Sequence, residues 1–590
     1  MAYMEFPGVG YTEKDWDSSS AIVGGATDIC GVMIIAEKGP INKPTLVNSV
    51  DQAIEKFGSY IETAYGMYSI KGFFQNGGRS LYVSRLAHYT DITDASTLTA
   101  KTASVAIKDT RSSNSEDTIK FSDKSPSSLG NTYGVKIVDE HRVSTVLNSD
   151  TTTQATEISC KVVRDFVVGD WIVISDGSNK TYARIELINS AERKLTLNKQ
   201  LDNVFKSGAK VTTCDFKLET YRKTISGPVL EKEFIGCNMD PTSAYYVVNL
   251  VNSSSSGSSL VTCEDEYIDV ENVYEKLPVI STDVVYLTGG NDGLADFADT
   301  DIIGDPASKT GFYAFDNIHE MIHVWCPESH SKAVIRAGFD YWTQKLTGMY
   351  FSMVPSGLNP EAAAEFRDEA GWNTSYGVLY HNWGYVTDPI GVGDAPEKLV
   401  PLTGHVLGCM AKHDRTDKDL YGSAPAGESC VLLGVNRLEF EVDDTNGGIM
   451  YGNKNRNVNP IVNLSGNGGI AVWGSRTQST VKKWMQIHAR RIFIYAETTI
   501  VTQTRWMAFR NKDDSLYTQA QRRVNKFLGG LKGLKGETDA DRYEFVCDST
   551  INDPEDSYVI GRIGLNIVSV GEFVWFEFGQ KPEGVSLAEI

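Results

Sequence analysis

The chain has 590 residues and a formal net charge of −20, with 41% hydrophobic and 22% charged residues. These values indicate a soluble protein with several domains, and no apolar run approaches the roughly 18 residues that a membrane helix needs. The nine cysteines are scattered and never spaced C-x-x-C, which favours reduced, buried thiols over a disulfide framework or a zinc ribbon. The N-terminal sequence lacks the basic and apolar regions of a secretory signal, so we expect assembly in a cytosol.

After a polar arm (1–20), residues 21–92 show the pattern of the first part of an α/β domain. Two strand-like runs enclose two helix-like segments, the first capped by Asn48 and Ser49 and the second ended by Gly77 and Gly78. The predicted strands are 29–36 and 81–86, and the predicted helices are 48–57 and 65–76. This β–α–α–β order is typical of an α/β domain.

The β-rich stretch 93–280 interrupts this domain. It is rich in Ser, Thr and Asp at first, and then shows short alternating strands separated by turns such as Asp176-Gly177. The predicted strands are 171–174, 182–188, 195–197 and 208–212. We therefore expect inserted, outer β-rich domains of barrel or sandwich type.

The α/β pattern returns over 281–430. Apolar strands alternate with amphipathic helices, which predicts crossover connections and a mixed, largely parallel sheet. The predicted strands are 321–325, 349–354 and 376–380, and the predicted helices are 332–346 and 360–368. The remaining chain is assigned to a C-terminal α+β module (431–565) and a C-terminal strand and arm (566–590).

One motif raises the hypothesis of a zinc-dependent hydrolase. His319-Glu320-x-x-His323 fits H-E-x-x-H, with Cys326 and His330 as further candidate ligands. That motif requires a helix, whereas Pro327 follows and the run 321–325 reads as a strand. In a strand the two imidazoles would lie about 13 Å apart, far beyond the ~4 Å that two zinc–nitrogen bonds bridge. No nucleotide loop or nucleophile elbow is present, so catalysis is unsupported and no cofactor is expected.

The charge reverses between residues 476 and 535. Thirteen Lys and Arg stand against three acids, which gives this window +10 and the rest of the chain −30. Such an excess is compatible with a solvated face, with nucleic-acid binding or with docking on an acidic protein surface. A predicted helix after Asp513 places Arg522, Arg523 and Lys526 beside an apolar stripe. The apolar stripe consists of Leu516, Ala520, Val524, Phe527 and Leu528. Strands 492–495 and 544–547 are expected to flank this helix, and a further strand-like run spans 562–578.

Several stretches resemble the contractile tail sheath family of myovirus-type bacteriophages, which is related to the sheaths of R-type tailocins and type VI secretion. The order of these stretches over about 20–92 and 281–578 carries the resemblance, more than any one of them. They are GVMIIAEKGPINKPTLVNS (31–49), FFQNGG (73–78), LYVSR (81–85), PLTGHVLG (401–408), KHDR (412–415), APAG (424–427), VWGSRT (472–477), RRIFI (490–494) and TRW (504–506).

The resemblance implies a non-enzymatic structural subunit of a virion tail, assembled in the host cytoplasm. Hexameric rings would stack around a tail tube, meet baseplate and tail terminator proteins, and contract to drive the tube through a target envelope, with no membrane insertion and no direct nucleic-acid contact. Terminal arms would add strands to neighbouring subunits. The residues implicated are Arg522, Arg523 and Lys526 on a tube-facing helix, Lys482, Lys483, Arg490 and Arg491 on a further basic face, and Val9, Tyr11, Phe573, Val574, Trp575 and Phe576 in the arms. The alternatives are the zinc hydrolase and a nucleic-acid-binding protein using the basic window.

Overall fold

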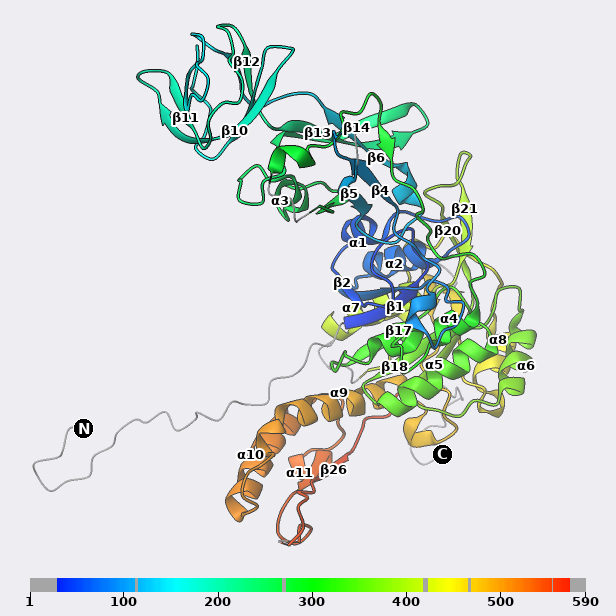
Figure 1. Ribbon diagram of the computed structural model, residues 1–590. Helices are drawn as coiled ribbons and strands as arrows, with labels where there is room; N and C mark the ends of the chain where they lie inside the picture. Colours follow the sequence, from blue (N-terminus) through cyan, green and yellow to red (C-terminus); the bar gives the residue numbers. More distant parts are fainter. Residues whose placement is uncertain are drawn as a thin grey trace, which may run out of the picture.

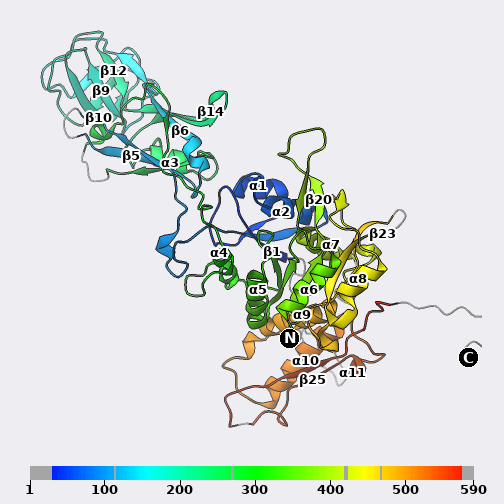
Figure 2. The ribbon, with the colours of Figure 1, turned by 90° about the vertical axis from the view of Figure 1, so that its right-hand side faces the viewer.

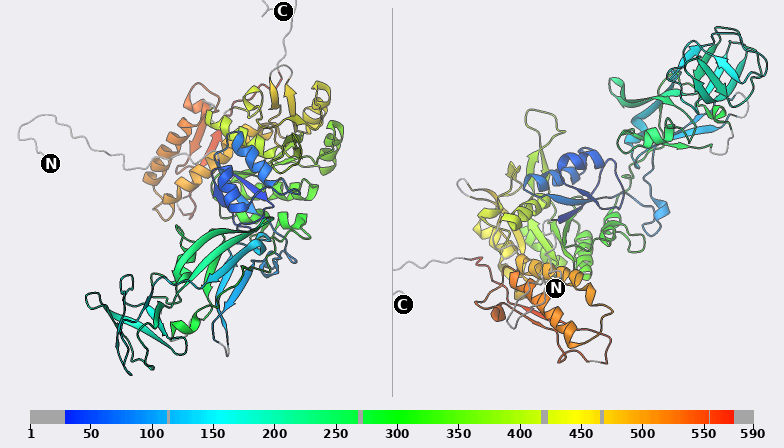
Figure 3. Two further views of the ribbon diagram at one scale, coloured as in Figure 1. Left: turned by 90° about the horizontal axis from the view of Figure 1, so that it is seen from above. Right: turned by 90° about the vertical axis from the view of Figure 1, so that its left-hand side faces the viewer.

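The computed structural model describes residues 29–111, 115–267, 272–416, 423–464, 468–553 and 555–573. Figure 1 shows three regions in a row: β-rich outer domains, a central α/β core, and a lobe of helices with a two-stranded sheet. Figures 2 and 3 show the same order from other sides. Within the described ranges, no helix combines the length and apolar character needed to cross a membrane.

An eight-stranded sheet forms the centre of the core, in the order β2-β3-β1-β17-β18-β19-β23-β24. The five pairings from β3 to β23 are parallel, and only the outermost pairings at the two edges are antiparallel. The prediction of a mixed, largely parallel sheet is therefore confirmed. The strands are β1 (Ile29–Ile34), β2 (Thr45–Val47), β3 (Ser80–Arg85), β17 (Ile322–Trp325), β18 (Gly348–Met353), β19 (Gly377–His381), β23 (Val458–Leu464) and β24 (Gly469–Val472).

Helices cover both faces of this sheet. On one face Trp325 donates its indole N–H to Ser69 of α2, and α7 lies so close to α2 that a Cβ on Gly408 would stand 2.2 Å from the Phe73 carbonyl oxygen. On the other face Tyr350 packs against Gly338 of α5. The helices are α1 (Val50–Phe57), α2 (Gly66–Gln75), α4 (Asp299–Ile303), α5 (Lys332–Lys345), α6 (Pro360–Ala370), α7 (Thr403–Thr416) and α8 (Asp444–Tyr451); a small side sheet joins β20 (Gly384–Thr387), β21 (Glu397–Val400) and β22 (Arg437–Leu438).

The inserted region forms two β-rich units. The unit nearer the core contains a four-stranded and a three-stranded sheet with one short helix, around its own apolar core. Its elements are β4 (Ser104–Lys108), β5 (Asp117–Asp123), β6 (Tyr133–Val138), β13 (Phe216–Thr224), β14 (Gly227–Cys237), α3 (Val247–Asn252), β15 (Val261–Asp265) and β16 (Val285–Tyr286).

The distal unit is a six-stranded antiparallel sheet whose edges meet. Its order is β7-β12-β9-β10-β11-β8, and the bridge between Leu147 and Cys160 joins the two outer strands into a barrel. The predicted alternating strands are confirmed here, because their inward residues fill a separate apolar core. The strands are β7 (Ser144–Val146), β8 (Glu157–Ser159), β9 (Trp171–Ser175), β10 (Lys180–Asn189), β11 (Lys194–Leu197) and β12 (Lys210–Thr213).

In the C-terminal lobe, residues 487–573, a helix replaces one of the two predicted flanking strands. Residues 492–495 belong to a 17-residue helix and not to a strand, and β23 and β24, from the stretch assigned to the C-terminal module, complete the core sheet. The strand-like run 562–578 supplies a strand only over Arg562–Leu565 within the described residues. The lobe consists of α9 (Ile487–Gln503), α10 (Asp514–Gly530), α11 (Asp539–Arg542), β25 (Tyr543–Val546) and β26 (Arg562–Leu565).

Candidate interaction surface of the C-terminal lobe

Helix α10 carries the three cations predicted to form a docking ridge. The Asp513 carboxylate caps it by accepting a 2.8 Å hydrogen bond from the Leu516 amide. The side of the helix toward the lobe is apolar, and its buried residues are Leu516, Tyr517, Ala520, Val524 and Leu528. Arg522 and Lys526 are exposed, whereas Arg523 is half-buried with its guanidinium 4.2 Å from the centre of the Trp506 ring. The amphipathic helix is therefore confirmed, and two of its three cations face solvent.

Further exposed cations lie on neighbouring segments. Lys482 and Lys483, two of the four residues predicted to form a further basic face, are exposed just before α9. The loops on either side of α10 add four exposed cations, Arg505, Arg510, Lys532 and Lys535. Of the thirteen cations in the basic window, eight are therefore exposed, Lys512 and Arg523 are half-buried, and Arg476, Arg490 and Arg491 are buried.

Arg490 and Arg491 are buried, which corrects their assignment to the basic face. The Arg490 guanidinium lies between the rings of Trp484 and Tyr376, at 3.9 and 4.6 Å from their centres. Arg491 donates to both carboxylate oxygens of Asp414, and the Nη1–Oδ1 distance is 2.8 Å. Charge alone predicts exposure for these two positions, yet a guanidinium is tolerated in the interior when a carboxylate or aromatic faces accompany it.

The candidate zinc ligands do not converge. His319 and Glu320 are exposed ahead of β17, while His323 lies in β17 and is buried. Its Nε2 accepts a 3.0 Å hydrogen bond from Arg491 Nε, and burial together with this neighbouring cation keeps the pKa of His323 well below 6.5. His330 packs on the ring of Trp383 instead. Within the described ranges no three His, Cys, Asp or Glu side chains are placed to hold a metal ion, so the geometry gives the zinc hypothesis no support.

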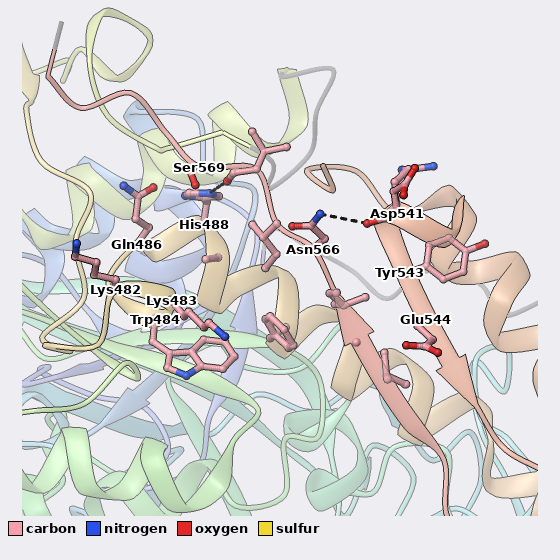
Figure 4. Close-up of a pocket in the computed structure, with 18 of the residues that line it drawn as sticks. Lys482, Lys483, Trp484, Gln486, His488, Asp541, Tyr543, Glu544, Asn566 and Ser569 are labelled. Atoms are coloured by element: carbon pink, nitrogen blue, oxygen red, sulfur yellow. Dashed lines mark hydrogen bonds between the residues drawn. The ribbon is translucent and has the colours of Figure 1, made fainter. Parts of the chain in front are cut away.

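A groove of about 690 Å³ separates the start of α9 from the two-stranded sheet of β25 and β26. Figure 4 shows Lys482, Lys483 and Trp484 on one wall, with Tyr543 and Glu544 of β25 on the other. Apolar side chains lie between these polar rims, namely Phe493, Ile563, Leu565 and Ile567. Within the described part of the chain, β25 and β26 pair only with each other, so this sheet offers backbone groups at its edges.

The chain after β26 is held by the Glu572 carboxylate and by His488 of α9, whose Nε2 donates a 2.9 Å hydrogen bond to the Val568 carbonyl oxygen. Residues 566–568 run beside 533–535, with hydrogen bonds from Lys535 N to Asn566 O and from Val568 N to Gly533 O. Glu572 then accepts from Arg476 Nε at 2.9 Å, from the Tyr451 hydroxyl at 2.8 Å and from Gln486 Nε2 at 3.1 Å. We call residues 566–573 the strap.

The arm residues are only partly described. Phe573, at the end of the strap, is 74% exposed and lies outside any strand. Val9, Tyr11, Val574, Trp575 and Phe576 lie outside the described residues. The clamp on Glu572 escaped sequence reasoning, because its three partners lie 86 to 121 residues away and no spacing links them.

Comparison with known proteins bears on this architecture. No protein-family model and no curated protein matches the chain. Among solved structures, it is similar to the sheath tail protein of Listeria innocua, with 9% identity, a TM-score of 0.50, and coverage of 92% of this chain and 96% of that one.

Two other solved structures align over comparable lengths. They are the sheath tail protein of Desulfitobacterium hafniense (9% identity, TM-score 0.48, 95% of this chain and 100% of that one) and the contracted helical sheath of the anti-feeding prophage (13%, 0.49, 98% and 100%). The similarity to the Listeria protein shows the fold: the chain folds like that sheath tail protein. All three neighbours are sheath or sheath tail proteins.

Proposed function

We propose that this chain is the subunit of a contractile tail sheath, polymerising as stacked hexameric rings around a tail tube and contracting to drive the tube through a target envelope. The observation that carries the proposal is the similarity of nearly the whole chain, 92% of it, to a sheath tail protein. The partners would be further copies of the chain, the tube, the baseplate and the tail terminator. The protein would be assembled in the host cytoplasm, reside in the tail of the particle, and require no cofactor.

The two-stranded sheet of the lobe is the proposed joint between subunits. A neighbouring arm could pair with its edges, since added strands bind through main-chain hydrogen bonds while side-chain pockets set the register. The groove beside β26 supplies such pockets, because Trp484, Phe493 and Leu565 line it. The arms would be residues 1–20, with Val9 and Tyr11, and the chain from Phe573 onward, with residues 574–576.

The exposed cations of the lobe are the proposed contact with the tube. Arg522 and Lys526 lie on one side of α10 and face solvent. Charged contacts across a wet interface steer and align two surfaces without the full cost of desolvating them. Such a surface suits a subunit that must hold the tube before contraction and slide over it afterwards.

The test is deletion of the arms. Removing residues 1–20, or the last ~25 residues, from the full chain should turn rings or tubes into soluble monomers, because strand addition would be the main link between subunits. The control is Ile225→Ala, at a fully exposed position on the outer β13–β14 hairpin, which should leave assembly unchanged. Truncated chains that polymerise like the full chain would refute the role of the arms.

A further inference from the structure

Two buried cysteines lie side by side just beneath the surface of the α/β core. Cys409 belongs to α7, and Cys430 ends the short helical turn Glu428–Cys430. The Cys409 Sγ lies 3.9 Å from the Val431 carbonyl oxygen and 4.0 Å from the Ser429 carbonyl oxygen, and these two residues flank Cys430. The two thiols share a hydrogen bond, and both are free in the structure. The fold therefore brings together two sulfurs that no sequence spacing links.

Cys409 has the electrostatics of a reactive thiol. The hydrogen bond with Cys430 lowers the pKa of Cys409 against the effect of burial, and the exposed Lys412 ammonium, one turn later on α7, acts in the same direction. The same hydrogen bond raises the pKa of Cys430. By contrast, burial raises the pKa of the Cys160 thiol to about 12. Because the thiolate is the nucleophilic form, Cys409 is the sulfur of the pair that reacts first.

A single surface turn covers the two sulfurs. Cys409 and Cys430 are only 2% and 1% exposed, whereas Glu428 and Ser429 face solvent. The Ser429 hydroxyl lies 4.0 Å from the Cys430 Sγ, and its carbonyl oxygen lies at the same distance from the Cys409 Sγ. Surface turns open locally more readily than core strands. Such an opening admits a small oxidant and excludes a bulky one.

We propose that Cys409 and Cys430 form a peroxide-sensitive dithiol, which closes to a disulfide when hydrogen peroxide reaches it. The Cys409 thiolate attacks one oxygen of the peroxide and becomes a sulfenic acid, and the hydroxide that leaves takes up the proton lost by Cys409 to form water. The Cys430 sulfur then attacks the Cys409 Sγ, so that the S–S bond forms and the S–O bond breaks. The Cys430 proton leaves with the hydroxyl group as a second water. The two thiols lose two electrons, and the peroxide gains them.

The disulfide would tie α7 to the edge of the core sheet. The chain after the turn runs along the edge strand β24, where the Leu432 amide donates a 2.7 Å hydrogen bond to the Ile470 carbonyl oxygen and Val431 forms a bridge with Ala471. A covalent link at this edge suppresses local opening of the turn. The use of the link rests on the proposed sheath function, because a particle built in a reducing cytosol meets an oxidising exterior only after its release.

The experiment treats the purified full-length chain with hydrogen peroxide, alkylates the remaining thiols under denaturing conditions, and maps unreduced peptides by mass spectrometry. Peptides joined through Cys409 and Cys430, lighter by two hydrogen atoms, should form at least about tenfold faster than any other cysteine is oxidised. Cys160→Ser, which removes an equally buried thiol from the distal barrel, should leave that rate unchanged. Two thiols that stay reduced, a different cysteine pair that forms first, or oxidation of Cys409 without a link to Cys430 overturns the inference.

Single variants separate the roles of the two sulfurs. In Cys430→Ser, dimedone should label the sulfenic acid at Cys409, whereas in Cys409→Ser the labelling of Cys430 should be at least about tenfold slower. Equal labelling of the two variants overturns the order of attack. The wild-type peptide map decides the existence of the link even where a variant folds poorly.

The link should also protect the turn from proteolysis. A glutamyl endopeptidase should cut after the exposed Glu428 about tenfold more slowly in the oxidised chain, and dithiothreitol should restore the rate. An unchanged rate in linked protein overturns the locking role. Electron microscopy of the same samples keeps the two proposals apart. Rings or tubes without the disulfide overturn only this inference, whereas a disulfide in a chain that never polymerises overturns the sheath function and leaves the dithiol chemistry standing.

Discussion

Removal of the Asp414 carboxylate should destabilise the core more than any exposed charge change. The side chains of Asp414 and Arg491 are each only 1% exposed, and the pair makes two charge-assisted hydrogen bonds. Asp414→Ala removes the carboxylate that faces the buried guanidinium, while the neutral His323 ring still accepts from Arg491 Nε. Breaking a buried pair in this way costs about 3–5 kcal/mol. We therefore expect the free energy of unfolding of the α/β core to fall by that amount.

The measurement is urea unfolding followed by tryptophan fluorescence, since Trp325 and Trp342 are fully buried in this core. The matched control is Asp150→Ala in the distal barrel, which breaks an exposed pair with Lys206 and should leave the core transition unchanged. A double variant, Asp414→Leu with Arg491→Met, should recover most of the loss, because apolar replacement of both partners is close to neutral. A loss below about 1 kcal/mol for Asp414→Ala would refute the reasoning from burial.

Three further outcomes are expected. Glu572→Ala should release the strap, because Arg476, Tyr451 and Gln486 lose their common acceptor. Limited proteolysis should then cut the C-terminal segment about tenfold faster than in wild type, and an unchanged cleavage rate would contradict the role of Glu572. Glu328 accepts hydrogen bonds from the Ile35 and Tyr65 amides, and burial raises its pKa from 4.5 to about 7. The free energy of unfolding should therefore fall as the pH rises from 4.5 through 7. Glu328→Gln should flatten that slope, and a variant with the same pH profile as wild type would contradict the expected protonation of Glu328. Arg522→Glu with Lys526→Glu should weaken tube retention without affecting sheath polymerisation, and Lys206→Glu on the barrel serves as the control; full retention by the double variant would contradict the tube-facing role.

Local signals predicted most of the core correctly. Ser49 and Asp513 each cap a helix, with a side-chain oxygen accepting from the first turn. The alternation of apolar strands with amphipathic helices predicted the parallel sheet, since such strands need crossover connections. These features are encoded within short windows of sequence, which is why they could be derived without a structure.

Features that depend on distant partners could not be predicted. The run 492–495 is short and apolar, and such runs do not distinguish strand from buried helix; in the structure it lies inside α9, with Ile492 and Ile494 buried. Arg491 meets an acid 77 residues earlier in the chain, and Arg476 meets one 96 residues later. Charge alone suggested exposure for these arginines, whereas their long-range pairing places them inside.

The most direct test of the sheath function is electron microscopy of the purified full-length chain. The account predicts rings or hollow tubes built from stacked six-fold rings, with the C-terminal lobe lining the inner wall and the β-rich units on the outside. Monomers at every concentration, or polymers with the lobe on the outer wall, would contradict it.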